Sequence, residues 1–172
     1  MFQDEARFGR INSARRCWAA RGVRPDVPTQ IVREYTYTYA AVSPHDGVMD
    51  SLVLPKVNEE CMSLFLKEVS GRHPDEFLLM AMDGAGWHKA KDLRVPENMA
   101  LHFLPPHSPE LNPTEHIWDH IRENDFKNEV FNNMRGVEDR LVHSLKVLEQ
   151  NPSTVRSMTA FSWIADISLN AT

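Results

Sequence analysis

The hydrophobic and polar positions in the first third of this chain follow a period of two. Aromatic, β-branched and polar residues alternate there in a way that is typical of half-buried strands. The pattern predicts strands over residues 2–8, 29–42 and 48–54, with Gly9 ending the first and a turn at 43–47 joining the last two. We expect these segments to form antiparallel pairs.

Strands and helices alternate in the middle of the chain. Apolar residues three and four positions apart predict a helix over residues 58–70, ended by Gly71. Continuous apolar runs at 77–82 and 99–104 are typical of parallel strands that are buried on both faces. A short helix over 87–93 is expected between them.

The last part of the chain is predicted to be helical. Residues 130–149 carry an amphipathic stripe, and Pro152 begins a further helical segment. The whole order predicts an α/β fold with a mixed sheet, in which antiparallel hairpin strands join parallel strands and helices flank both. We expect a single domain over residues 1–172, with C-terminal helices in 127–172.

The junction between the last predicted strand and the next helix reads Leu-Pro-Pro-His-Ser-Pro-Glu-Leu-Asn-Pro-Thr-Glu-His-Ile-Trp from Leu104 to Trp118. Asn112 suits the N-cap and Pro113 the first helical position. Glu115 then falls at the third helical position, where its carboxylate is well placed to bind a metal ion. It also fits a capping box, in which it accepts a hydrogen bond from the backbone N–H of Asn112. The pattern alone leaves both roles open.

Composition narrows the class of protein. The chain is 42% hydrophobic and 25% charged, which is ordinary for a globular protein. No apolar run reaches the roughly 20 residues that span a bilayer, and no signal peptide opens the chain, so we expect no membrane association. Cys17 and Cys61 form no metal-ligand pattern and no disulfide framework, which favours the cytoplasm.

The net charge of −5 argues against a freestanding nucleic-acid-binding module. The charge is uneven, however, because residues 1–35 contain seven arginines. Either a local basic surface or a solvated loop would account for them. We expect Trp18 to pack the irregular segment 10–28 onto the sheet.

Three acidic residues lie where chemistry could use them. Asp4 interrupts the apolar face of the first strand, Asp83 follows a predicted buried strand, and Glu115 begins a helix. Carboxylates that converge at one end of a sheet repel each other unless cations neutralise them, and oxygen ligands suit Mg²⁺ or Mn²⁺. The alternatives are an exposed edge-strand acid for Asp4 and a turn residue before Gly84 for Asp83.

Histidines and known catalytic motifs offer alternative sites. His116 and His120 are four residues apart on a helix, a spacing that can bind zinc, although their order does not match the zinc-protease motif. His88 could contact a phosphate or be a surface histidine. No P-loop and no serine nucleophile elbow occur.

Three motifs in this order resemble the DDE catalytic domain of mariner-like bacterial insertion-sequence transposases, in the insertion-sequence family numbered six hundred and thirty. They are Phe-Gln-Asp-Glu-Ala-Arg-Phe-Gly at residues 2–9, Met-Asp-Gly-Ala-Gly-Trp-His at 82–88, and the segment 104–118. The sequence Trp-Ala-Ala-Arg-Gly-Val-Arg-Pro at 18–25 is also similar to the family. The resemblance covers roughly residues 1–125.

This resemblance implies an RNase H-like fold and two Mg²⁺ or Mn²⁺ ions bound by Asp4, Asp83 and Glu115. The implied reaction is nicking of DNA at transposon ends, followed by attack of the freed 3′-hydroxyl on target DNA. Transposon-end and target DNA are then the partners, with His88, Arg21 and Arg24 as expected DNA contacts. A homo-oligomer is expected in the active complex.

The chain departs from the family in places. Asp83-Gly84 stands where many relatives have Asp-Asn, and the spacing from Asp83 to Glu115 is somewhat short. The family's N-terminal helix-turn-helix region is not recognised, so a truncated copy or a separate helix-turn-helix polypeptide is expected. The alternatives are an inactive transposase remnant and an RNase H-like nuclease without strand transfer.

Overall fold

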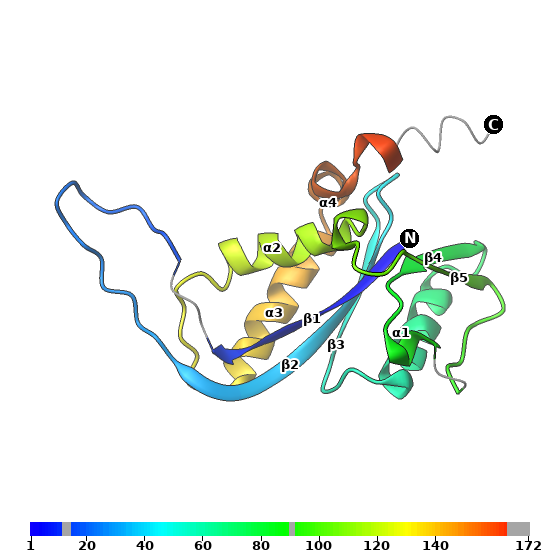
Figure 1. Ribbon diagram of the computed structural model, residues 1–172, viewed down its shortest axis with the longest axis horizontal. Helices are drawn as coiled ribbons and strands as arrows, with labels where there is room; N and C mark the ends of the chain where they lie inside the picture. Colours follow the sequence, from blue (N-terminus) through cyan, green and yellow to red (C-terminus); the bar gives the residue numbers. More distant parts are fainter. Residues whose placement is uncertain (12–14, 90–91, 165–172) are drawn as a thin grey trace.

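The computed structural model describes residues 1–11, 15–89 and 92–164 and contains a five-stranded mixed sheet with helices on both faces (Figure 1). The strands are β1 (Phe2–Ile11), β2 (Ile31–Val42), β3 (Met49–Leu54), β4 (Leu78–Met82) and β5 (Met99–Phe103). The helices are α1 (Glu59–Arg72), α2 (Thr114–Asn124), α3 (Met134–Glu149) and α4 (Pro152–Thr159), with short 3₁₀ turns η1 (Gly86–Lys89) and η2 (Pro109–Leu111).

The strand order is β3-β2-β1-β4-β5. Strands β1, β2 and β3 form antiparallel pairs, whereas β4 runs parallel to both β1 and β5. The predicted fold class is therefore confirmed. The β-branched and aromatic residues of β2 suit its place beside β1 at the centre of the hairpin region.

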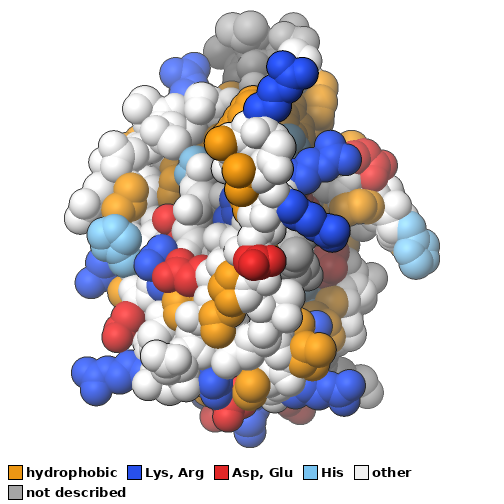
Figure 2. Space-filling model, turned by 90° about the vertical axis from the view of Figure 1, so that its left-hand side faces the viewer, with side chains coloured by type: hydrophobic (Ala, Val, Ile, Leu, Met, Phe, Trp, Pro, Cys, Tyr) orange, Lys and Arg blue, Asp and Glu red, His pale blue; other side chains and the backbone are white. Residues whose placement is uncertain are grey.

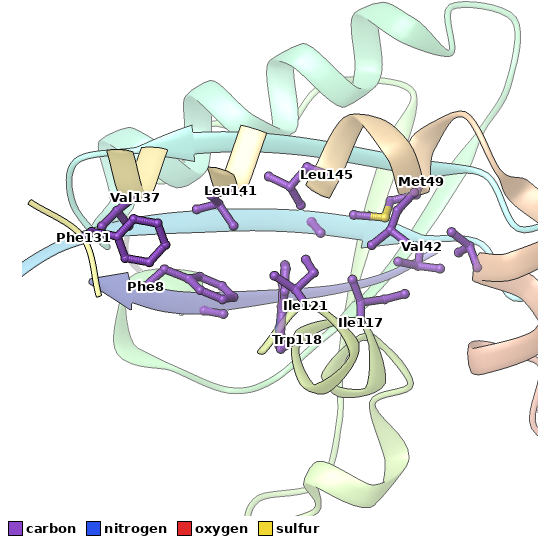
Figure 3. Close-up of a cluster of buried hydrophobic side chains, with 14 residues drawn as sticks. Phe8, Val42, Met49, Ile117, Trp118, Ile121, Phe131, Val137, Leu141 and Leu145 are labelled. Atoms are coloured by element: carbon purple, nitrogen blue, oxygen red, sulfur yellow. The ribbon is translucent and has the colours of Figure 1, made fainter. Parts of the chain in front are cut away.

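One core lies between the sheet and helices α2, α3 and α4. Figure 3 shows its side chains, among them Phe8 of β1, Trp118 of α2 and Leu141 of α3. Trp118 and Leu141 are fully buried. This packing fixes α2 against β1, and α2 carries Glu115 at its start.

A second core lies on the opposite face, where α1 covers the sheet. Tyr39, Phe65 and Met80 are fully buried there, from β2, α1 and β4. Tyr37 packs beside them, on the same face of β2 as Tyr39.

Several predicted boundaries were wrong. Strand β1 continues through Gly9 to Ile11, and α1 continues through Gly71 because the helix is capped at His73 instead. The prediction that 77–82 is buried on both faces was also wrong, since Leu79 is 58% exposed. Helix α1 covers only one face of β4, and α2 and α3 pack over β1 to β3.

The predicted start of the C-terminal helix at residue 130 was a further error. Helix α2 ends at Asn124 and α3 starts only at Met134, where the Asn133 side chain accepts a hydrogen bond from the backbone N–H of Gly136. The predicted helix at 87–93 is a 3₁₀ turn as far as Lys89, and residues 90–91 lie outside the described part. In that part, no helix is long and apolar enough to cross a membrane.

Residues 15–30 project from the body between β1 and β2 as an irregular segment (Figure 1). Figure 2 looks at the molecule from this side and shows Lys and Arg side chains among apolar and neutral ones. The prediction that Trp18 anchors this segment was wrong, because its side chain is fully exposed.

Candidate active site

A cavity of about 410 Å³ lies at the end of the sheet where β4 and β5 finish. Asp4 of β1, Asp83 after β4 and Glu115 of α2 all line it. The loop after β5 forms much of the remaining wall, from Leu104 to Pro109. The three acids that were predicted from separate motifs therefore face one space.

Asp4 lies on an internal strand, between β2 and β4, so the edge-strand alternative was wrong. Its Oδ2 accepts a 2.7 Å hydrogen bond from Nε1 of the fully buried Trp118. Burial, and next the nearby carboxylate of Glu115, raise the pKa of Asp4 to about 7. Glu115 thus disfavours the charged form of Asp4, as expected for a carboxylate beside another.

The start of α2 positions Glu115. The Asn112 side chain donates to the backbone oxygen of Gln3 at 2.9 Å and accepts from the backbone N–H of Thr114 at 3.2 Å. The Thr114 hydroxyl donates to the backbone oxygen of Phe2 at 2.9 Å. Two side chains thus tie the first turn of α2 to β1, close to Asp4.

The capping-box alternative for Glu115 is not what the structure contains. The backbone N–H of Asn112 donates to the oxygen of Pro109, and α2 begins at Thr114, one residue later than predicted. Glu115 is therefore the second residue of the helix. Its carboxylate is left to face the cavity that it lines.

Asp83 is a turn residue, and it also lines the cavity. Its Oδ1 accepts a hydrogen bond from the backbone N–H of Ala85 at 3.0 Å, which is an Asx turn. The same oxygen lies 2.7 Å from Nδ1 of His88. The side chain is 58% exposed, so it also reaches the cavity.

His88 is buried, with only 2% of its surface exposed. Its Nε2 lies 2.8 Å from Oε1 of Glu5, and its Nδ1 also lies 3.0 Å from the backbone oxygen of Asp83. Burial lowers the pKa of His88, but the contacts with Glu5 and Asp83 outweigh burial and raise it above 6.5. A phosphate contact by His88 would require these interactions to break.

Sequence reasoning missed Glu5. Its only signal was the alternation of β1, which places Glu5 on the opposite face from Asp4. It also missed the contact between Trp118 and Asp4, because a tryptophan on an apolar helix face is ordinarily just core. Arg21 and Arg24 lie on the exposed projecting segment, away from the residues that line the cavity.

The donor chemistry of the cavity fits Mg²⁺ or Mn²⁺, because all three acids offer oxygen ligands and two of them repel each other. Within residues 1–11, 15–89 and 92–164, no three His, Cys, Asp or Glu side chains are close enough together to hold a metal ion. The acids therefore share a cavity without forming a finished ligand set. The same finding gives the zinc alternative no support; the ring of His116 packs on Phe161 instead.

The sequence is similar to a described protein family and to one further protein. A sequence model of the family described as DDE superfamily endonuclease matches residues 1–137. An uncharacterized protein of Sinorhizobium fredii, y4pE/y4sA, is 35% identical over 131 residues, which is 75% of this chain and 96% of that protein.

Solved structures of the Mos1 mariner transposase are similar in fold. The pre-cleavage Mos1 transpososome has a TM-score of 0.64 at 12% identity, over 99% of this chain and 55% of the Mos1 chain. The Mos1 paired-end complex with Mn has a TM-score of 0.63 at 13% identity, over 96% and 54%. The chain thus spans about half the length of these mariner chains.

Proposed function

We propose that this chain, which belongs to the DDE superfamily endonucleases, is the catalytic domain of a transposase and cleaves DNA at transposon ends. The observation that carries the proposal is the shared cavity of Asp4, Asp83 and Glu115. These residues come from three elements that are far apart in the sequence. Their meeting at one end of the sheet is what a phosphoryl-transfer site of this family needs.

Asp4, Asp83 and Glu115 would hold Mg²⁺ or Mn²⁺, with two ions as the proposed number. Such ions, when bound, lower the pKa of an attacking hydroxyl and stabilise the leaving oxygen of an in-line displacement at phosphorus. The protein's own part is positioning. Trp118 holds the Asp4 carboxylate, and the first turn of α2 sets the height of Glu115.

One site can serve two proposed steps. In the first, water attacks a phosphodiester at the transposon end and frees a 3′-hydroxyl. In the second, that hydroxyl attacks a phosphodiester of target DNA and displaces another 3′-oxygen. Both steps are displacements at phosphorus, so the same three acids are suited to both.

Arg21 and Arg24 are proposed DNA contacts. Both are exposed on the projecting segment, whereas Arg10 and Arg15 on the same side are paired with Glu34 and Glu123. Among the described residues, neither Arg21 nor Arg24 has an ion-pair partner, and such an arginine is better placed to bind a phosphate. The Mos1 structures are of paired-end and strand transfer complexes, which supports transposon-end and target DNA as proposed partners. A homo-oligomer and a separate helix-turn-helix polypeptide are further proposed partners.

Replacing Glu115 tests the proposal. We expect Glu115→Gln to reduce Mn²⁺ affinity and nicking of a transposon-end duplex by more than about 100-fold. Removing a metal ligand should weaken metal binding more than removing a hydrogen-bond partner of a ligand does. Calorimetry measures the first quantity and gel analysis of nicked duplex the second. Asp119→Asn is the matched control, since this acid lies on the same helix, is exposed, and does not line the cavity.

The alternatives give different results in the same assays. A nuclease without strand transfer would nick the duplex but never join its 3′-end to a target plasmid. An inactive remnant would bind Mn²⁺ no better than its Glu115→Gln variant. Equal loss in Asp119→Asn and Glu115→Gln would contradict the assignment of the cavity.

A further inference from the structure

Glu5 and His88 form a buried chain of polar contacts that ends on Asp83. The side chain of Glu5 is 7% exposed and that of His88 is 1% exposed, so the cavity does not include them. Oε1 of Glu5 also accepts a hydrogen bond from Nε1 of Trp87 at 3.3 Å. The chain runs from β1, through the turn after β4, to an acid that lines the cavity.

Both nitrogens of His88 face acceptors. Nε2 faces the Glu5 carboxylate, and Nδ1 faces the backbone oxygen and the Oδ1 of Asp83. The ring is therefore held from both sides, by Glu5 of β1 and by Asp83 after β4, and these contacts fix its orientation.

We infer that Glu5 and His88 are positioning residues that fix the Asp83 carboxylate in the orientation needed to bind a divalent cation. This inference rests on the proposed function and adds two residues that do not contact the cation themselves. His88 and the N–H of Ala85 hold Oδ1 of Asp83 from two directions. The carboxylate then has one oxygen engaged by the protein, and in the described part of the chain its Oδ2 has no protein partner.

Charge and position make opposite predictions for His88. If His88 acted only through charge, its removal would tighten cation binding, because a positive charge beside an acidic cavity opposes a second cation. Removing the group that orients Asp83 should weaken it, because partners of a ligand contribute about 10- to 100-fold to metal affinity. The sign of the change in affinity therefore separates a positioning residue from a charge that only adjusts the local potential.

The experiment measures the Kd of Mn²⁺ by calorimetry on the full chain. We expect His88→Ala to raise the Kd by about 10-fold or more. Glu5→Gln keeps the size of the side chain and an acceptor for Nε2, so we expect a smaller rise. His143→Ala is the matched control, since this histidine is exposed on α3, and its Kd should equal that of the unmodified chain.

Imidazole provides a second readout. The space left in His88→Ala should accept imidazole, which can again bridge Glu5 and Asp83, and added imidazole should lower the Kd of this variant. It should not do so for Asp83→Ala, which lacks the ligand itself. Thermal unfolding of each variant is measured alongside. If His88→Ala does not fold, Glu5→Gln carries the test.

The outcomes separate this inference from the proposed function. Mn²⁺ binding that is lost in Asp83→Ala but unchanged or tighter in both His88→Ala and Glu5→Gln would overturn the inference alone. No Mn²⁺ binding by the unmodified chain would overturn both. Weaker binding in the two variants, restored by imidazole in His88→Ala, would support the inference.

Discussion

At the scale of single residues, two buried polar side chains destabilise the folded state. Gln3 and Thr38 are fully buried, and neither the amide of Gln3 nor the hydroxyl of Thr38 has a hydrogen-bond partner among the described residues. A buried polar group without a partner costs about 1–3 kcal/mol. Gln3 lies next to Asp4 on β1, and Thr38 lies on the neighbouring strand β2, opposite Ala6.

Apolar replacement of these side chains should stabilise the protein. We expect Gln3→Met and Thr38→Val each to raise the free energy of unfolding by about 1 kcal/mol, because an unpaired polar group is removed at similar volume. Urea denaturation measures the change. Thr159→Val is the control, since Thr159 is equally buried but its hydroxyl donates to the oxygen of Val155, so no gain is expected. If Thr38→Val lowered the free energy of unfolding as much as Thr159→Val does, the prediction would be contradicted.

Sequence motifs singled out the three acids that line the cavity, but not the residues that surround them. Asp4, Asp83 and Glu115 each stood out by place: within an apolar face, after a strand, and at a helix start. The contacts of Trp118 with Asp4 and of Glu5 with His88 join residues more than 80 positions apart. Local patterns carry no information on such pairings, and their detection required the fold.

At the scale of elements, the start of α2 depends on one side chain that bonds in two directions. Asn112 is buried, and it joins α2 to β1 through Gln3 while capping Thr114. Loss of a helix cap typically costs about 1 kcal/mol, and loss of a buried hydrogen bond adds to this. The position of Glu115 depends on the same two bonds.

Asn112→Ala should therefore lower the free energy of unfolding by about 2 kcal/mol. Asn124→Ala, at the other end of α2, removes only exposed contacts with the backbone oxygen and Nδ1 of His120, and we expect a change below about 0.5 kcal/mol. Chemical denaturation of both variants measures the difference. A similar fall in the free energy of unfolding in both variants would contradict this role of Asn112.

Element types were predicted better than their ends and their exposure. Gly71 did not stop α1, because a glycine inside a helix costs only about 1 kcal/mol and Pro74 lies three residues further on. The apolar run at 77–82 suggested burial on both faces. Whether a strand has one or two covered faces depends on where distant helices pack. The periodicity of the strand's own sequence carries no information about that packing.

At the scale of the whole molecule, a polar cluster joins β3, α1 and α3. Oδ1 of the buried Asp50 lies 3.1 Å from Arg72, and its Oδ2 lies 2.8 Å from Nε2 of His73. Nδ1 of His73 lies 2.7 Å from Glu76, and Glu149 of α3 accepts from Ser51 beside them. Burial lowers the pKa of His73, but the hydrogen bonds to Asp50 and Glu76 outweigh it and raise the pKa above 6.5.

This shift predicts how stability changes with pH. A histidine whose pKa is raised in the folded state contributes stability fully below its unfolded pKa, near 6.5, and loses it as pH rises through the folded pKa. We expect the free energy of unfolding to fall with rising pH above about 6.5. The decline should be smaller in His73→Gln and unchanged in His143→Gln. An identical pH profile in His73→Gln would refute the assignment.

The fold class as a whole could be predicted, because the order of antiparallel and parallel segments is already present in the hydrophobic pattern. The resemblance to a family then supplied the topology. The projecting segment could not be predicted in this way. The expected contact of Trp18 with the sheet assumed that a tryptophan is buried, and its exposure shows that composition does not determine burial for an irregular segment.

The pairing of β1 with β4 divides the site into two parts. In the described chain, the only register pair between these strands is Phe2 with Ala81, whereas β4 and β5 are paired along their whole length. We call this short pairing of β1 with β4 the seam of the sheet. Asp4 lies on the β1 side of the seam, and Asp83 lies on the β4 side. A small rotation of β4 and β5 about the seam would change the separation of these two acids without breaking the sheet.

Glu115 belongs to the Asp4 side of the seam, because Asn112 and Thr114 bind α2 to β1. Glu5 and His88 reach across it. Two of the acids are thus tied directly to β1, and Asp83 is tied to it through His88 and Glu5. The separation of Asp4 and Asp83 therefore depends on the contact between Glu5 and His88 as well as on the single register pair between the strands.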